Sequence, residues 1–315
     1  MRTGQNDTVR PGAVLIAGPT AGGKSALAVD LARRIGGVVI NADSMQVYRE
    51  LRIITARPAP GDEQGVPHRL YGTVSAREAY SAGLWLEQAG REIDAAVASG
   101  RTPVLVGGTG LYFEAVTKGL APVPDVPGEI RTTVEHDLRT RGLNALRGEL
   151  SARDPNYARE AAGLDPQRVV RALSVLQATG RSLRDWQGDP PAPAILDQDA
   201  VVRMVLMPAR DVLYARINRR VDTMIEAGAI DEVRAFLDLD VPPGSPAMKA
   251  IGVAQLGAHL RGTLELDEAR ADMARTTRNY AKRQMTWFRH RMADWPASAD
   301  HGPDLLERIA GQFAA

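Results

Sequence analysis

Residues Gly18 to Ser25 read Gly-Pro-Thr-Ala-Gly-Gly-Lys-Ser and match the phosphate-loop pattern G-x-x-x-x-G-K-[ST]. An apolar run at 13–17 precedes them, and a helical pattern at 26–34 follows. In such a loop, backbone N–H groups and the helix N-terminus surround an anion. Lys24 adds a full positive charge, and the hydroxyl of Ser25 can bind Mg²⁺. An ordinary glycine turn is the alternative, but the flanking strand and helix favour a site for a diphosphate or triphosphate.

The bulk properties exclude several classes of protein. The 315 residues suffice for about two domains, or for one large domain with an insertion. The absence of cysteine excludes disulfides, thiolate zinc sites and cysteine nucleophiles. The first ten residues lack the apolar region of a signal peptide. No apolar run approaches the ~20 residues of a membrane span. We therefore expect a cytoplasmic protein without a membrane segment.

Further buried strands are expected at 38–41, 102–107 and 200–207, with helical patterns between and after them. This alternation predicts an α/β fold, a P-loop NTPase-like parallel sheet flanked by helices. Two proline-rich stretches enclose a segment whose pattern is entirely helical. The prediction is a loose tail at 1–11, a P-loop catalytic core formed by 1–121 and 197–315, and an inserted all-helical domain at 122–196.

Polar residues follow two of the expected strands. In an open parallel sheet, the ligand crevice lies beyond the carboxyl ends of the strands. Asp43, Ser44 and Gln46 follow one strand and Thr109 follows the next, so all four are expected beside the loop. The alternatives are a helix N-cap for Asp43 and a hydroxyl cap of the following helix for Thr109. The third strand ends in glycines, where many P-loop NTPases have a magnesium-binding Asp, which weakens kinase and ATPase interpretations.

Two basic segments favour RNA as a partner. Residues 275–291 carry six Lys or Arg residues and no Asp or Glu, with Tyr280, Trp287 and Phe288 interleaved. Basic residues with interleaved aromatics suit a nucleic-acid backbone with unstacked bases. A solvated charged face over an apolar core is the alternative. In the predicted insertion, the polar residues of the segment 167–171 form a second such surface.

With these motifs in place, the chain from Val14 to Trp295 resembles the tRNA dimethylallyltransferases, also called tRNA isopentenyltransferases. The blocks that carry the resemblance are GPTAGGKS (18–25), NADSMQVY (41–48), VPHRL (66–70), YSAGLW (80–85), PVLVGGTGLYF (103–113), DPQRVVRAL (165–173), LYARINRRVDTMIEAG (213–228) and YAKRQMTWFRH (280–290). Two segments depart from the family pattern. The chain has RIITARP at 52–58 instead of DIGTAKP, and IGVA at 251–254 lacks an aromatic and a charge at an expected tRNA-facing turn.

The resemblance implies transfer of a dimethylallyl group from dimethylallyl diphosphate, with Mg²⁺, to N6 of the adenine at position 37. That adenine adjoins the anticodon in tRNAs reading codons that start with U, and the products are N6-(dimethylallyl)adenosine and diphosphate. By resemblance, Asp43 is the general base and Thr109 contacts the bridging oxygen of the donor. The expected diphosphate-binding residues are Gly18, Pro19, Thr20, Ala21, Gly22, Gly23, Lys24, Ser25, Arg216 and Arg220.

The resemblance also implies that the partner is the anticodon stem-loop of a tRNA; we expect the protein to be a monomer. The expected tRNA-binding residues are Asp43, Ser44, Met45, Gln46, Thr109, Arg131, Gln167, Arg168, Val169, Val170, Arg171, Lys282, Arg283, Gln284, Thr286, Trp287 and Arg289. A P-loop nucleotide or small-molecule kinase, which would bind ATP, is one alternative, but it leaves the basic C-terminal helix unexplained. A non-catalytic RNA-binding protein with a vestigial loop is another, and the intact Lys24 and Asp43 speak against it.

Overall fold

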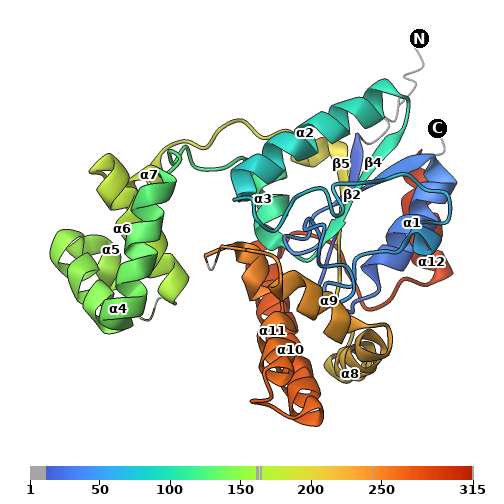
Figure 1. The fold of residues 1–315 in the computed structure, drawn as a ribbon. Helices are drawn as coiled ribbons and strands as arrows, with labels where there is room; N and C mark the ends of the chain where they lie inside the picture. Colours follow the sequence, from blue (N-terminus) through green and yellow to red (C-terminus); the bar gives the residue numbers. More distant parts are fainter. Residues whose placement is uncertain (1–11, 161–162, 164, 243, 314–315) are drawn as a thin grey trace, which may run out of the picture. The chain divides into compact units, whose positions relative to one another are not determined.

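The structure, a computed structural model, describes residues 12–160, 163, 165–242 and 244–313, so the tail expected at 1–11 lies outside the described residues. A six-stranded sheet has the order β3-β2-β4-β1-β5-β6, and every pairing is parallel. This confirms the predicted α/β fold (Figure 1). The strands are β1 (Ala13–Ala17), β2 (Gly37–Asn41), β3 (His68–Arg69), β4 (Thr102–Gly107), β5 (Val201–Leu206) and β6 (Ala297–Ser298).

Helices cover both faces of the sheet because successive side chains of a strand point to opposite faces. Val14 and Ile16 of β1 pack with apolar residues of α1 (Lys24–Ile35) and α12 (Pro303–Ala310). Leu15 lies in the other core, beneath α2 (Ala82–Ala98) and α3 (Gly110–Lys118). β1 is fully buried in the middle of the sheet, so the loop that follows it begins at the centre of one edge of the sheet, at the carboxyl ends of the strands.

The remaining helices of this part follow β5. They are α8 (Arg210–Glu226), α9 (Ala229–Leu237), α10 (Val253–Leu260) and α11 (Leu266–Arg291), with a 3₁₀ turn at Pro246–Lys249. The sequence pattern predicted these helical segments, but not β3, β6 or α12. Two-residue strands are too short to show a period, so only their pairing in the sheet reveals them. No helix of the described ranges is long and apolar enough to cross a bilayer.

One carboxylate fixes the loop at 51–57, which departs from the family pattern. Glu232 of α9 accepts hydrogen bonds from the backbone N–H groups of Arg52 (2.8 Å), Ile53 (2.8 Å) and Ile54 (3.0 Å). The Thr55 hydroxyl closes the same turn by donating to the carbonyl of Leu51 at 2.6 Å. Glu232 therefore fixes the backbone of this loop without using the exposed side chain of Arg52, while the buried Ile54 anchors the loop in the core.

The helical insertion is a compact unit from Lys118 to Ala194, between parts of the chain that end at Thr117 and resume at Ile195. The predicted bounds, 122 and 196, differ from these by four and two residues. Its helices are α4 (Gly128–Arg153), α5 (Pro155–Glu160), α6 (Pro166–Thr179) and α7 (Leu183–Gly188). The insertion has its own core, to which α4 contributes Val134, Leu146 and Leu150 and α6 contributes Leu173.

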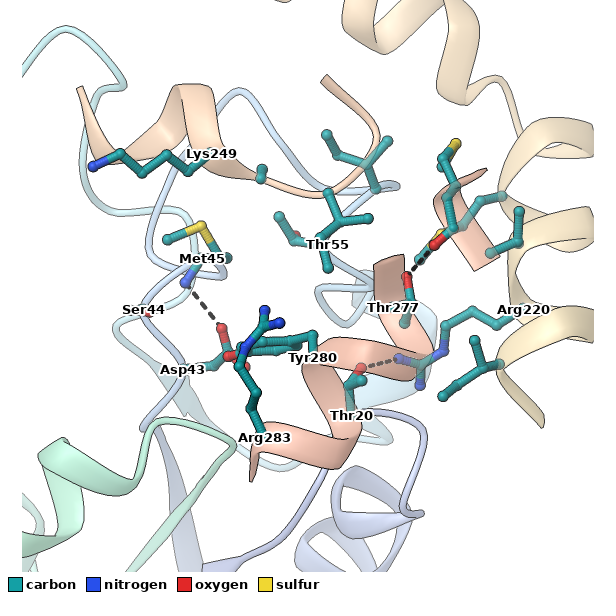
Figure 2. Close-up of a pocket in the computed structure, with 17 residues that line it drawn as sticks. Thr20, Asp43, Ser44, Met45, Thr55, Arg220, Lys249, Thr277, Tyr280 and Arg283 are labelled. Atoms are coloured by element: carbon teal, nitrogen blue, oxygen red, sulfur yellow. Dashed lines mark hydrogen bonds between the residues drawn. The ribbon is translucent and has the colours of Figure 1, made fainter. Parts of the chain in front are cut away.

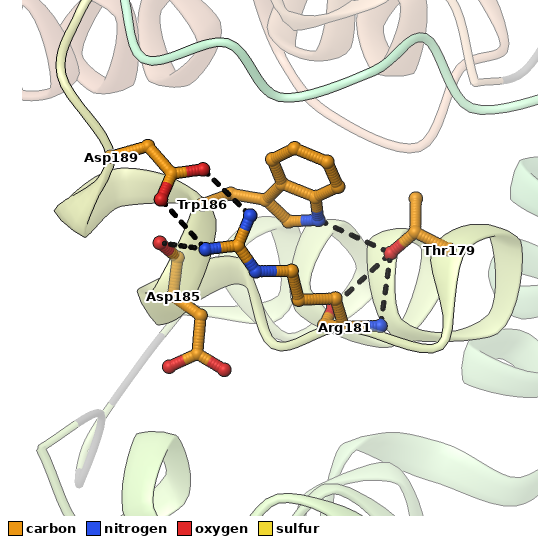
Figure 3. Close-up of polar contacts among 5 residues, drawn as sticks. All are labelled: Thr179, Arg181, Asp185, Trp186 and Asp189. Carbon is orange, nitrogen blue, oxygen red and sulfur yellow. Dashed lines mark hydrogen bonds and ion pairs between the residues drawn. The ribbon is translucent and has the colours of Figure 1, made fainter.

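A polar cluster closes the turn between α6 and α7 (Figure 3). Arg181 donates to both carboxylate oxygens of Asp189, at 2.6 and 2.7 Å, and to the carbonyl of Asp185 at 3.0 Å. Its guanidinium lies 4.4 Å from the ring centroid of Trp186, whose indole N–H donates to the Thr179 hydroxyl at 3.3 Å. These bonds raise the pKa of Arg181 and lower that of Asp189. Because the ion pair is exposed, its main effect is to fix the geometry of the turn.

Candidate active site

The loop between β1 and α1 is followed by Lys24, whose ammonium group is buried, and this burial destabilises its charged form. Its ammonium donates to the carbonyl of Pro19 at 2.7 Å. Burial lowers the pKa of Lys24 from 10.5 to about 8; the carboxylate of Asp43 opposes this shift and Arg220 adds to it. Arg220 of α8 donates to the hydroxyl of Thr20 at 3.1 Å, and burial lowers its pKa as well. Two poorly hydrated cations in one cavity favour the entry of an anion.

A cavity of about 250 Å³ lies over this loop. Its lining residues are Thr20, Ala21, Gly22, Gly23, Lys24, Ser25, Ala26, Asp43, Gln46, Thr55, Ala56, Tyr71, Val106, Gly107 and Arg220. Of the two arginines expected at the diphosphate, Arg220 lines the cavity. Arg216 lies close to Gly23 of the loop: its Nη1 atom is 3.7 Å from the position that a Cβ on Gly23 would occupy. We call this space the phosphate cavity.

A second cavity, of about 290 Å³, adjoins the first and shares Thr20, Asp43, Thr55 and Arg220 with it (Figure 2). We call it the apolar chamber, because apolar atoms make up the larger part of its lining surface. Its apolar lining consists of Met45, Ile54, Ile217, Val221, Met224, Ala250, Ile251 and Met273. The polar residues Ser44, Lys249, Thr277, Tyr280 and Arg283 complete the lining. Asp43 thus stands where a charged, loop-lined space meets an apolar one.

Asp43 is held by its own backbone and by a buried asparagine. Asn41, the last residue of β2, accepts from the N–H of Asp43 at 2.9 Å and donates to the carbonyls of Asp43 and Leu70 at 3.0 and 3.1 Å. The indole N–H of Trp85 in turn donates to the carbonyl of Asn41 at 2.8 Å. One oxygen of the Asp43 carboxylate accepts the N–H of Met45 at 2.9 Å. No α-helix begins here, so the helix-cap alternative for Asp43 is wrong.

Thr109 does not cap the helix that follows it. Its hydroxyl accepts the N–H of Ser44 at 2.9 Å and donates to the Ser44 hydroxyl at 3.3 Å. This joins the turn after β4 to the segment that carries Asp43. Thr109 is not among the residues that line either cavity. Gln46 donates to the carbonyls of Thr55 and Ala56, both at 3.0 Å, and lines the phosphate cavity.

Most of the residues of α11 expected at the tRNA lie on its exposed side. Lys282, Arg283, Thr286 and Trp287 line an open surface depression, and Arg289 is exposed. Gln284 is an exception, and the expectation that its side chain lies on the tRNA-binding surface is corrected. Its side chain is 5% exposed and both ends of its amide bind backbone groups, so it faces the core and not the open side of the helix.

One further expectation about the RNA-binding surface was wrong. Val169 and Val170 of α6, expected at the tRNA, are 1% and 4% exposed and lie in the core of the insertion. The helix places them opposite the exposed Gln167, Arg168 and Arg171, so their side chains cannot reach a ligand.

Arg131 of α4 pairs with Glu135 at 3.0 Å, and burial, with the charge of Arg131 adding to it, lowers the pKa of Arg171. The insertion therefore brings two of the expected RNA-binding cations together. At the departure from the family pattern at 251–254, Val253 is 2% exposed and faces the core, whereas Ala254 is exposed and Ile251 lines the apolar chamber.

Comparison with known proteins agrees with this geometry. The family model described as IPP transferase matches residues 46–291. The tRNA dimethylallyltransferase of Rhodopseudomonas palustris (strain ATCC BAA-98 / CGA009) is 52% identical over 295 residues, which cover 92% of each chain. The enzyme of the same name from Rhizobium etli is 52% identical over 282 residues, covering 90% of this chain and 95% of the relative.

Solved structures point the same way. The tRNA isopentenylpyrophosphate transferase of Bacillus halodurans superimposes with a TM-score of 0.68 at 36% identity, covering 96% of both chains. A eukaryotic dimethylallyltransferase acting on tRNA gives a TM-score of 0.72 at 26% identity, over 88% of this chain and 69% of that one. With a phosphate loop, an adjoining apolar chamber and a carboxylate between them, the chain belongs to the IPP transferase family.

Proposed function

We propose that this protein transfers a dimethylallyl group from dimethylallyl diphosphate to N6 of an adenine in tRNA. The observation that carries the proposal is the meeting of the phosphate cavity and the apolar chamber at Asp43. A donor with a diphosphate at one end and a short apolar chain at the other suits the pair of cavities. The bond to be broken would then lie beside Asp43. The names of the relatives support the same reaction.

The residues suit a direct displacement. The N6 amine attacks the allylic carbon; a C–N bond forms, the C–O bond to diphosphate breaks, and N6 loses a proton. The adenine amine is a poor nucleophile, so a carboxylate that accepts this proton as the bond forms lowers the barrier. Asp43 takes that role. Lys24, Arg220 and the N–H groups of the loop neutralise the charge that grows on the departing diphosphate.

Mg²⁺ is part of the proposal. Ser25 lines the phosphate cavity and offers a hydroxyl oxygen, a ligand type that Mg²⁺ accepts alongside phosphate oxygens. This side chain would hold the ion against the diphosphate, where it would supply further neutralising charge.

The finer features of the substrate follow the resemblance. We place the adenine at position 37, beside the anticodon, in tRNAs that read codons starting with U. A base in an anticodon loop can be turned out into a pocket at low energetic cost. The basic residues of α11 and the cationic pair of the insertion would bind the RNA backbone, with the protein acting as a monomer in the cytoplasm.

The direct test is to incubate the purified protein with unmodified tRNA and dimethylallyl diphosphate, and in parallel with ATP. We expect N6-(dimethylallyl)adenosine in the digested tRNA, detected by mass spectrometry, and no turnover of ATP. Turnover of ATP without prenylated tRNA would favour the kinase alternative. Binding of tRNA with neither reaction would favour a non-catalytic RNA-binding protein.

Neutralising Lys282, Arg283 and Arg289 together with glutamine should weaken tRNA binding and flatten its dependence on salt. Each phosphate contact that is lost lowers the log–log slope by up to roughly 0.7 for a single strand, so the triple variant should lose up to about two units. The measurement is a titration of tRNA binding at several salt concentrations. Arg278 is left intact because it donates to Asn218 of α8 at 2.7 Å and does not belong to the open face.

A triple variant at the exposed Arg91, Arg101 and Arg308 is the matched control. It removes the same charge from other parts of the surface, so it reports the effect of net charge alone. If both triple variants keep the slope of the parent, α11 carries only a solvated charged face.

The affinity for pyrophosphate should fall as the pH rises through about 8. The free protein holds Lys24 with a pKa of about 8, and an ammonium is needed to bind the anion. Below that pH the lysine is already charged; above it, binding must first take up a proton, which costs up to roughly tenfold in affinity per pH unit. Calorimetry from pH 7 to 9.5 checks this, with Lys24→Arg, whose guanidinium stays charged over this range, to account for the titration of pyrophosphate itself. A parent and a variant with parallel pH profiles would contradict it.

A further inference from the structure

The amide of Gln284 joins two segments of the site that are far apart in the chain. Its oxygen accepts the N–H of Thr20 in the phosphate loop at 2.9 Å, and its nitrogen donates to the carbonyl of Gly108 at 2.9 Å. Gly108 belongs to the turn after β4 that also carries Thr109. Both partners are backbone groups, so the bonds fix the course of the two segments relative to α11.

The bond to Thr20 acts on the peptide group that also holds Lys24. The carbonyl of Pro19 and the N–H of Thr20 belong to the same peptide plane. Its carbonyl oxygen accepts a hydrogen bond from the ammonium of Lys24, and its N–H donates one to the side-chain oxygen of Gln284. Thr20 also accepts from Arg220 and lines both cavities. The orientation of this one peptide therefore bears on both cations of the phosphate cavity.

The contact between α11 and the turn after β4 is close. A Cβ on Gly108 would lie 2.3 Å from the amide nitrogen of Gln284 and 3.3 Å from a carboxylate oxygen of Asp43. A Cβ on Gly110 would lie 2.0 Å from the indole nitrogen of Trp287. Gln284 and Trp287 are three residues apart on α11 and thus on the same side of it. The glycines of this turn make room for α11 to lie directly on it.

We propose that Gln284 is a positioning residue for prenyl transfer. Its amide fixes the positions of the phosphate loop and of the turn that carries Thr109 relative to α11. The adenine of a tRNA bound to the outer side of α11 is thereby aligned with the donor in the phosphate cavity. This inference rests on the proposed function. Gln284 lines neither cavity and binds backbone groups of the phosphate loop and the turn, so its loss should act on donor affinity and on the rate while the affinity for tRNA stays the same.

The test compares Gln284→Met with the parent. Methionine has a similar length but leaves two buried backbone groups without partners. We expect the affinity for pyrophosphate, measured without tRNA, to fall about tenfold and kcat to fall by about tenfold or more. The Kd for tRNA should stay within about twofold. Gln88→Met of α2 is the control, because Gln88 also accepts a hydrogen bond, from Tyr80 at 2.8 Å, but this bond involves neither the phosphate loop nor the turn after β4.

Gln284→Glu adds a pH profile that a merely structural role would not produce. A protonated carboxyl group has the shape of the amide and can both accept from Thr20 and donate to Gly108. Burial beside Asp43 raises the pKa of such a group. The kcat of this variant, relative to the parent, should therefore recover as the pH falls from roughly 8.5 to 6.

Three results would overturn the inference. A loss of tRNA affinity with pyrophosphate affinity and kcat unchanged would make Gln284 a tRNA contact. A lower melting temperature with unchanged binding and kcat would make it a packing residue only. A Gln284→Glu profile parallel to that of the parent would exclude the proposed hydrogen-bond geometry, even if Gln284→Met does not fold. A parent protein that transfers no prenyl group would instead refute the proposed function, and the pyrophosphate measurement would still test Gln284.

Discussion

Replacing Asp43 by asparagine is expected to slow prenyl transfer by about 10²–10⁴-fold, the usual contribution of a positioned acid–base group. Asparagine is nearly isosteric, and its oxygen can still accept the N–H of Met45 as the carboxylate does. It cannot accept a proton from N6. Binding of tRNA and of donor should therefore stay close to normal while the chemical step fails. Single-turnover transfer with both substrates saturating measures that step.

Asp197→Asn provides the matched control. The carboxylate of Asp197 accepts the N–H of Asp199 at 3.0 Å, the same i to i+2 contact that Asp43 makes with Met45, but Asp197 lines neither cavity. This control should react at the parent rate. An Asp43→Asn variant that also reacts within about threefold of the parent would reduce Asp43 to a turn-stabilising residue.

Replacing Lys24 by alanine should nearly abolish binding of the diphosphate. Truncating one partner of a buried charge pair costs roughly 2–5 kcal/mol. That cost corresponds to about a 30-fold to several-thousand-fold loss of affinity. The fold should survive, because the substitution removes a poorly hydrated ammonium whose pKa is already lowered to about 8. Calorimetry with pyrophosphate measures the affinity, and thermal unfolding should show a melting temperature no lower than that of the parent.

Lys118→Ala removes the same charge from the exposed end of α3 and should bind pyrophosphate as the parent does. Equal affinity in the parent and in Lys24→Ala would remove Lys24 from the diphosphate site.

Local patterns predicted the parts of the fold that local interactions determine. β1, the phosphate loop and α1 follow one another, so strand periodicity, glycines and helix periodicity identify them without knowledge of distant residues. β3 and β6 escaped prediction because each has two residues and exists only through its neighbour in the sheet. The division into a sheet part and an insertion was visible because proline-rich stretches enclose the helices.

The candidate site was predictable in its position but not in all its side chains. A motif names the residues that recur together, but it does not say which of them face the core. For Gln284 a signal was present: Ala281, Met285 and Phe288 are buried on the same side of α11. For Asn41 and Trp85, which hold Asp43 in place, the partners are backbone atoms. Sequence patterns carry little information about such partners, so only the structure reveals these supports.

The hydrogen bonds from the loop at 51–57 to Glu232 use backbone groups only, so they do not depend on the identity of the residues that donate them. The backbone course of the loop is set from outside by one carboxylate, whereas Ile54 forms part of the wall of the apolar chamber. The exposed side chain at position 52 can therefore vary without redirecting the chain. Position 54 is different, because its side chain packs in the core as well as against the chamber, so a change of size there would alter the chamber and the anchoring of the loop together.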